Sequence, residues 1–89
     1  MSVYEKEFSV ELTVALPANH VGFDKLTDAL FDAGFDDASV GTGRANQLGV
    51  AVTRPGHDAK SVSAETSARV LKALPVGCSI IQVFVEDSL

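Results

Sequence analysis

The sequence contains two kinds of hydrophobic repeat, and their order limits the folds that are open to the chain. From Lys6 to Ala15 apolar and polar residues alternate, which predicts a strand with one buried face. From Phe23 to Ala33 apolar residues recur every three or four positions, which predicts an amphipathic helix. The same change from a strand pattern to a helix pattern occurs again in the second half. Since each element must bury its apolar side, we expect helices packed on one face of a sheet.

Turn residues and local patterns predict the remaining elements. Gly34 is expected to end the first helix with a positive φ, and Phe35 would then contact Leu30 as in a Schellman motif. In the same turn, Asp36 and Asp37 are expected to hydrogen-bond backbone groups and so hold Gly34 in place. The further predicted segments are a short strand at 38–42, a stronger strand at 48–53, a turn at 54–58, a second helix at 60–74 and a last strand at 78–86.

The second helix has a predicted inner face that is made mainly of small side chains. Ser61 or Ser63 is expected to cap its start, and Pro75 with Gly77 is expected to end it. The residues expected on the inner face are Ala64, Ser67, Ala68, Leu71 and Leu74, with Val70 beside them.

The order strand, helix, strand, strand, helix, strand predicts an α+β fold. Right-handed crossovers would place both helices on one face of a four-stranded antiparallel sheet. The expected architecture is a two-layer ferredoxin-like sandwich with the first and third strands in the centre. A chain of 89 residues has room for one such core, so 1–89 is expected to form a single domain.

Charge and hydropathy exclude several classes of protein. The net charge is −5, and the seven basic residues are scattered without forming a basic stripe. Nucleic-acid binding depends largely on neutralising phosphates, so we expect no direct binding of DNA or RNA by this chain. No apolar run approaches the roughly 20 residues of a membrane span, and the N-terminus has no signal-like segment. We therefore expect no membrane partner and a cytoplasmic location.

No set of residues predicts catalysis. His20 and His57 lie in predicted loops without metal-binding spacing, so neither a metal nor a cofactor is expected. Cys78, the single cysteine, begins an apolar strand and is expected to be a buried, unreactive thiol. The first loop, ALPANHVG, lacks the cysteine pair of a soft-metal carrier and the arginine of an acyl-phosphate hydrolase. We accordingly expect a protein that is not an enzyme.

The uncovered face of the sheet is the main candidate for self-association, because a partly apolar face without helices can pack on another sheet. If Ile81, Val83 and Val85 point to the helices, the residues predicted on this open face are Thr13, Ala51, Ile80, Gln82 and Phe84. In the alternative phase of the last strand, Ile81, Val83 and Val85 point outward instead.

Two smaller surfaces are further candidates. These are an acidic stripe on the first helix, Asp24, Asp28 and Asp32, and a glycine-rich segment, Gly41, Gly43 and Arg44. The acidic stripe has the four-residue spacing of one helix side and would suit a basic partner, with a solvated helix face or the binding of a divalent cation as the alternatives. Successive backbone N–H groups in the GTGR segment could cradle an anion, although a hairpin turn is the simpler interpretation.

The segments DALFDAGFDDASVG and LGVAVTR, with a second helix that ends in ALPVG, resemble a family of small bacterial proteins. That family has an N-terminal ferredoxin-like domain with an EAGxDDAxVG-like signature, followed by a helix-turn-helix. Its members are described as regulators or antitoxin-like proteins. The similarity covers about residues 8 to 86 and includes Ala33, Gly34, Asp36, Asp37, Ala38, Val40 and Gly41. The sequence stops at VFVEDSL, where the helix-turn-helix would begin, so the resemblance implies a regulatory domain without direct DNA binding.

These observations predict a non-enzymatic interaction and dimerisation module. A second copy or another protein would bind the open sheet or the acidic stripe. The alternative is a domain that senses a small ligand or an anion, at a dimer interface or near the GTGR segment.

Overall fold

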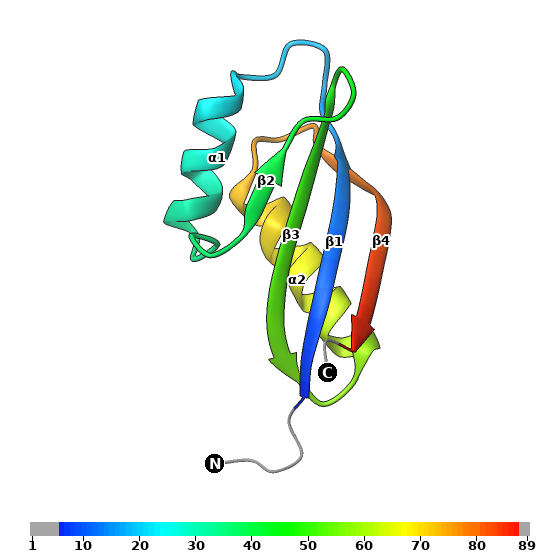
Figure 1. Ribbon diagram of the computed structural model, residues 1–89. Helices are drawn as coiled ribbons and strands as arrows, with labels where there is room; N and C mark the ends of the chain where they lie inside the picture. Colours follow the sequence, from blue (N-terminus) through cyan, green and yellow to red (C-terminus); the bar gives the residue numbers. More distant parts are fainter. Residues whose placement is uncertain (1–5, 88–89) are drawn as a thin grey trace.

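The computed structural model describes residues 6–87, which form the six predicted elements in the predicted order (Figure 1). The strands are Lys6–Ala15 (β1), Ser39–Gly41 (β2), Gln47–Gly56 (β3) and Ser79–Asp87 (β4). The helices are Phe23–Asp32 (α1) and Ala59–Ala73 (α2). Neither helix in this range is long and apolar enough to cross a membrane.

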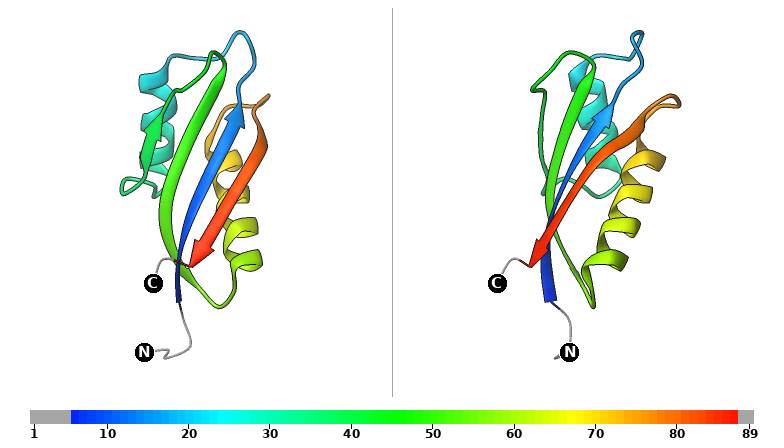
Figure 2. Two further views of the ribbon diagram at one scale, coloured as in Figure 1. Left: turned by 45° about the vertical axis from the view of Figure 1, so that its right-hand side comes forward. Right: turned by 90° about the vertical axis from the view of Figure 1, so that its right-hand side faces the viewer.

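The four strands form one antiparallel sheet in the order β2-β3-β1-β4, with β1 and β3 in the centre as predicted. Both helices lie on the same side of this sheet, as the right-hand view of Figure 2 shows. α2 packs against β4, β1 and β3, whereas α1 stands beside the β2 margin (Figure 1). The predicted α+β ferredoxin-like sandwich is therefore confirmed, and no helix of residues 6–87 covers the opposite face.

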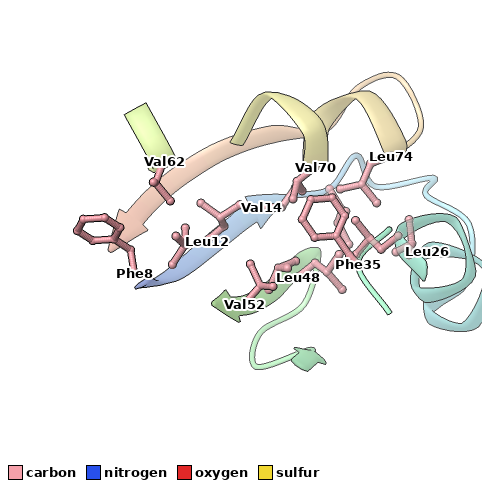
Figure 3. Packing of buried hydrophobic residues seen from close by; sticks show 14 residues of the cluster. Phe8, Leu12, Val14, Leu26, Phe35, Leu48, Val52, Val62, Val70 and Leu74 are labelled. Carbon is pink, nitrogen blue, oxygen red and sulfur yellow. The ribbon is translucent and has the colours of Figure 1, made fainter. Parts of the chain in front are cut away.

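The core lies between the sheet and the helices. Every second residue of the central strands enters it: Phe8, Val10, Leu12 and Val14 from β1, and Leu48, Val50 and Val52 from β3. This is the two-residue repeat of the sequence, since successive side chains on a strand point to opposite faces. Figure 3 shows the ring of Phe35 among the side chains of Leu26, Val70 and Leu74, where the two helices meet the sheet.

α1 ends in the Schellman motif that the sequence predicts. Gly34 has a φ of 101°, a conformation that is strained for residues with a side chain. The N–H of Phe35 donates to the carbonyl of Leu30 at 3.0 Å, and the N–H of Gly34 donates to the carbonyl of Phe31 at 3.1 Å. The reversal turns the chain back toward the core, so that Phe35 is only 1% exposed.

The connection between β3 and α2 is shorter than predicted. β3 continues to Gly56, beyond the predicted end of the strand at residue 53. α2 follows with Asp58 as its N-cap, whose carboxylate accepts a hydrogen bond from the N–H of Ser61 at 2.8 Å. The prediction that Ser61 or Ser63 caps this helix is wrong, because the carboxylate of Asp58 precedes them and binds the first free N–H groups.

The buried face of α2 also differs from the prediction. Its buried residues are Val62, Thr66 and Val70, which are spaced four apart. Leu74, directly after the helix, is buried as predicted. The predicted inner residues Ala64, Ala68 and Leu71 are exposed, and Ser67 is half-buried. Burying the larger β-branched side chains removes more apolar surface from water than burying the alanines, which favours this orientation of the helix.

Candidate interaction surface

The open face of the sheet consists of the side chains that point away from the helices. Strand pairing arranges them in rows that cross all four strands. Two such rows are Ser39, Ala51, Glu11 and Phe84, and Gly41, Gly49, Thr13 and Gln82. The predicted residues Thr13, Ala51, Gln82 and Phe84 thus lie together on this face. Since most members of the rows are small, the face has a shallow floor with Phe84 at its β4 margin.

A β-bulge in β4 changes which residues of this strand face the helices. Thr13 of β1 pairs with Gln82. The next residue of β1, Val14, pairs with Ile80, which leaves Ile81 as an extra residue in β4. Ile80 packs against the core, whereas Ile81 is 53% exposed. The predicted place of Ile80 on the open face is therefore wrong, because strict alternation of the side chains fails at the bulge.

All the exposed large apolar side chains of the described sheet lie on β4. Val83 pairs with the buried Leu12 and so points to the helix side, yet it is 42% exposed. Phe84 pairs with Glu11 on the open face and is 64% exposed. We call Ile81, Val83 and Phe84 the β4 strip. It reaches both faces of the sheet along one margin.

The middle of the open face is polar. Glu11 is exposed and lies between Ala51 of β3 and Phe84 of β4. A second sheet stacked directly over this point would bury the carboxylate, which costs several kcal/mol unless a cation pairs with it. The apolar exposure therefore lies at the β4 margin rather than across the whole predicted face.

The acidic stripe is an exposed side of α1. Asp24, Asp28 and Asp32 are all exposed, and none of them forms a salt bridge with another residue in the range 6–87. In the same range no group of three or more potential metal-ligating side chains gathers in one place. The stripe is thus a row of separate solvated charges, available to a partner but not assembled into a site.

The GTGR segment forms the hairpin between β2 and β3. The carbonyl of Arg44 accepts a hydrogen bond from the N–H of Gln47 at 3.2 Å, which closes the turn. The residue with the left-handed backbone is Asn46, with a φ of 60°, and neither Gly41 nor Gly43 has a positive φ. A nest of N–H groups around an anion combines right-handed and left-handed residues, so these glycines do not form one. A hairpin turn describes the segment.

The two histidines and the cysteine belong to three separate places. His20 lines a hollow of about 270 Å³ beside Arg44, and its Nδ1 lies 2.6 Å from the carbonyl oxygen of Val21. His57 lines a different groove, next to the start of α2. The connections that carry the histidines lie at opposite ends of the sheet (Figure 1). Cys78 packs against the core but is half-buried rather than buried as predicted, and this partial burial raises the pKa of its thiol, which therefore stays protonated at neutral pH.

A cluster of two arginines around Phe35 lies on the helix side of the sheet, and sequence reasoning missed it. The guanidinium carbons of Arg54 and Arg69 lie over the Phe35 ring, 5.1 and 5.6 Å from its centroid. Arg54 donates two hydrogen bonds to the carboxylate of Asp37, at 2.7 and 3.1 Å. The main partner of Asp37 is thus Arg54 of β3, rather than the backbone groups of the turn that the sequence predicts. The only sign of this cluster in the sequence was the acidic turn, and an acidic turn does not indicate which basic residue pairs with it.

Both arginines also bind the C-terminal end of α1. Arg54 donates to the carbonyl of Gly34 at 3.1 Å, and Arg69 donates to the carbonyl of Ala33 at 3.4 Å. Cations at this end of a helix offset its dipole, and the last turn of α1 has no basic residue of its own. The adjoining groove, of about 490 Å³, is also lined by Asp58 and Glu65 and so carries charges of both signs. The cluster therefore accounts for how α1 is held against β3 and α2.

Protonation of Asp37 is expected to weaken the fold. The hydrogen bond from Arg54 holds the pKa of this carboxyl below its usual range. Because the folded-state pKa is the lower one, the pair stabilises the protein above the unfolded-state pKa of about 3.9, and this contribution is lost as the pH falls through the folded-state value. We expect Asp37→Asn to unfold at lower urea concentration than the wild type at pH 7. The difference should shrink as the pH falls below about 4.

The exposed neighbour Asp36 provides the control for this measurement. It forms no salt bridge within residues 6–87, so Asp36→Asn is expected to follow the wild type at every pH. An effect of Asp37→Asn that stays equally large in acid would contradict the ion-pair explanation.

No protein-family model, curated protein or solved structure matches this sequence. The resemblance to the bacterial helix-turn-helix family, with its regulatory role, stays a prediction. The functional argument therefore depends on the surface of the molecule itself.

Proposed function

We propose that this chain is a non-enzymatic dimerisation module in which two copies associate through the β4 strip. The observation that carries the proposal is the exposure of Ile81, Val83 and Phe84, three close neighbours on one strand. Single exposed apolar residues are common on monomeric proteins. Adjoining ones are less common, and they are typical of surfaces that bind another protein.

The size of the strip suits reversible association. Burying a fully exposed large apolar side chain contributes about 1.5–3 kcal/mol. The three side chains of the strip are already partly covered, so together they would contribute about 3–5 kcal/mol. Two strips meet in a dimer, and part of this free energy offsets the freedom that is lost on association, so we expect a weak, reversible dimer that forms between micromolar and millimolar concentrations.

Charge also favours the β4 margin as the contact. Each copy carries a net charge of −5, so a contact that gathers charged residues would be repulsive. From Ser79 to Val85, β4 has no charged residue. Stacking through the middle of the open face would instead bring Glu11 into the interface. Anion sensing at the GTGR segment has less support, because none of its four residues has the positive φ that a nest of N–H groups requires.

Sedimentation equilibrium from about 2 μM to 1 mM tests the proposal. At the upper end we expect a mass of twice the 9.3 kDa of one chain. Phe84→Ser removes the most exposed side chain of the strip, and we expect it to weaken the dimer at least ~30-fold, the equivalent of about 2 kcal/mol. A wild-type mass that remains that of one chain throughout would refute the proposal.

Phe31→Ser is the matched control. Phe31 is an exposed phenylalanine of α1, 41% exposed and outside the β4 strip, so its replacement should leave the Kd unchanged. Salt provides a second control. Screening should strengthen or leave unchanged a dimer of like-charged copies, whereas it would weaken a complex formed by the acidic stripe and a basic surface.

A further inference from the structure

β4 is an edge strand whose outer side has no neighbour within the described chain. β1 is its one partner in the sheet, and no other element of residues 6–87 lies along its outer side in Figures 1 and 2. In an antiparallel ladder the backbone groups of a strand point alternately to either side. Alternate residues of 79–86 therefore direct their N–H and C=O groups away from β1. These groups are able to pair with a further strand.

The two edges of the sheet differ in how they are protected. β2 forms the opposite edge and has only three residues, which is a common way of preventing edge-to-edge pairing. β4 has nine residues, with no proline and no lysine or arginine among them. Beyond the bulge at Ile81, 82–87 pair regularly with β1, and charged side chains occur only at the last two of these residues. A regular segment long enough for strand addition is thus left uncovered.

The exposure on β4 affects both faces of the strand. Val83 points to the helix side and Phe84 to the open side, yet both are more than 40% exposed, at 42% and 64%. On the neighbouring strand β1 the residue paired with Val83, Leu12, is only 2% exposed. A second sheet stacked on the open face would cover Phe84 but not Val83. A strand placed beside β4 would cover the flanks of both.

We propose that β4 of one copy pairs antiparallel with β4 of a second copy, around a two-fold axis, so that the two sheets join into one of eight strands. This inference rests on the proposed dimerisation and specifies how the β4 strips meet. The outer backbone groups of each β4 would then be hydrogen-bonded across the axis. Val83 would meet apolar side chains of the second copy on the helix side, and Phe84 would do so on the open side.

The sequence of β4 fits a second copy of itself in this orientation. Its acidic residues stand at one end, Glu86 and Asp87, of which Asp87 forms an ion pair with Lys6 of β1 at 3.8 Å, and the opposite end is uncharged. Antiparallel pairing places the acidic end of each strand beside the uncharged end of the other, whereas parallel pairing would set the acidic ends side by side. Length and apolar pattern match by symmetry, as in the two-fold contacts that most homodimers use.

Two substitutions separate this geometry from face-to-face stacking. Val83→Lys places a charge on the helix side of the edge, and we expect it to weaken the dimer at least ~100-fold by sedimentation equilibrium. Ala51→Arg places a large charged side chain at the centre of the open face, away from the edge, and should change the Kd less than ~3-fold. Circular dichroism establishes that both variants are folded.

Amide hydrogen exchange of the wild type provides a measurement that needs no variant. Alternate amides of 79–86 should exchange slowly at millimolar concentration, where the dimer forms, and at least ~10-fold faster in the dilute monomer. The amides of β1 and β3, already paired within one copy, should respond much less. If Val83→Lys does not fold, or if both variants weaken the dimer, this exchange measurement decides between strand pairing and face-to-face stacking.

The possible outcomes distinguish the two proposals. A wild-type dimer that is broken by Val83→Lys and protected along alternate β4 amides supports strand pairing. A dimer that is broken by Ala51→Arg and not by Val83→Lys, or one with β4 amides equally exposed in monomer and dimer, overturns strand pairing and leaves the proposed dimerisation standing. A wild type that remains monomeric at 1 mM overturns both strand pairing and dimerisation. Any strand that pairs with β4 would then have to come from a different protein.

Discussion

Replacing Phe35 by alanine is expected to lower the free energy of unfolding by about 3–5 kcal/mol. The Phe35 ring is 1% exposed and lies where α1, α2 and the sheet meet (Figure 3), so its removal leaves a cavity that the rigid turn after Gly34 cannot close. It also removes the ring over which Arg54 and Arg69 lie. A domain of this length is stable by roughly 5–10 kcal/mol, so the loss would be a large part of the total. Urea unfolding followed by circular dichroism measures it.

Two variants separate the causes of this effect. Phe31→Ala removes the same atoms four residues earlier from a side chain that is 41% exposed, and should cost less than about 1 kcal/mol. Phe35→Leu keeps an apolar side chain but removes the aromatic ring, and should cost about 1–2 kcal/mol. A loss from Phe35→Ala no greater than that from Phe31→Ala would mean that Phe35 does not hold the helices to the sheet.

Gly56→Ala is expected to destabilise the protein by about 2–3 kcal/mol, although it adds only one methyl group. A Cβ at Gly56 would overlap Cγ2 of Val62, in the first turn of α2. Val62 is 6% exposed and cannot turn away without leaving the core. The start of α2 would therefore have to move away from the end of β3.

Shortening the opposing side chain should relieve this clash. In the double variant Gly56→Ala/Val62→Ala, we expect a loss at least about 1 kcal/mol smaller than the sum of the two single losses. Gly43→Ala is the control, because a methyl group added at Gly43 would meet open space within 4 Å and this residue needs no positive φ. Its replacement should be neutral or stabilising by a few tenths of a kcal/mol. Additive losses in the double variant would count against direct contact between the two residues.

The sheet was predictable because its central strands have the simplest environment. β1 and β3 each have a neighbour on both sides and helices on one face, so their side chains alternate between core and solvent without interruption. The end of α1 was predictable for another reason. Gly34 relieves a local backbone strain, and the hydrogen bonds that it enables join residues only three to five positions apart.

α2 was harder because its sequence contains two possible faces. The stripe Ala64, Ala68 and Leu71 has the spacing of a helix face, and so has the stripe Val62, Thr66 and Val70. Small residues surround both, so neither stripe stands out by hydrophobicity. The space above β1 and β3 selects the valine and threonine side chains, and that space exists only when the sheet has formed.

The candidate surface was partly predictable. Thr13, Ala51, Gln82 and Phe84 lie on the open face as expected. The bulge, however, places Ile80 against the core and leaves Ile81 exposed. Nothing in SIIQVFVED indicates where the bulge lies, because each of the first three residues could point to either face of the sheet. The importance of Val83 was not predictable, since its exposure depends on how far α2 extends over the edge strand.

The sequence by itself determined the order of the six elements, the core-facing residues of the central strands and the reversal at Gly34, because repeats and backbone preferences act over a few neighbouring residues. Only the tertiary structure decided the buried face of α2, the phase of β4 at its bulge and the arginine cluster around Phe35. In that cluster the partners are 17 to 36 residues apart in the chain. Contacts of that kind depend on the distances between packed elements, which no short-range pattern of residues encodes.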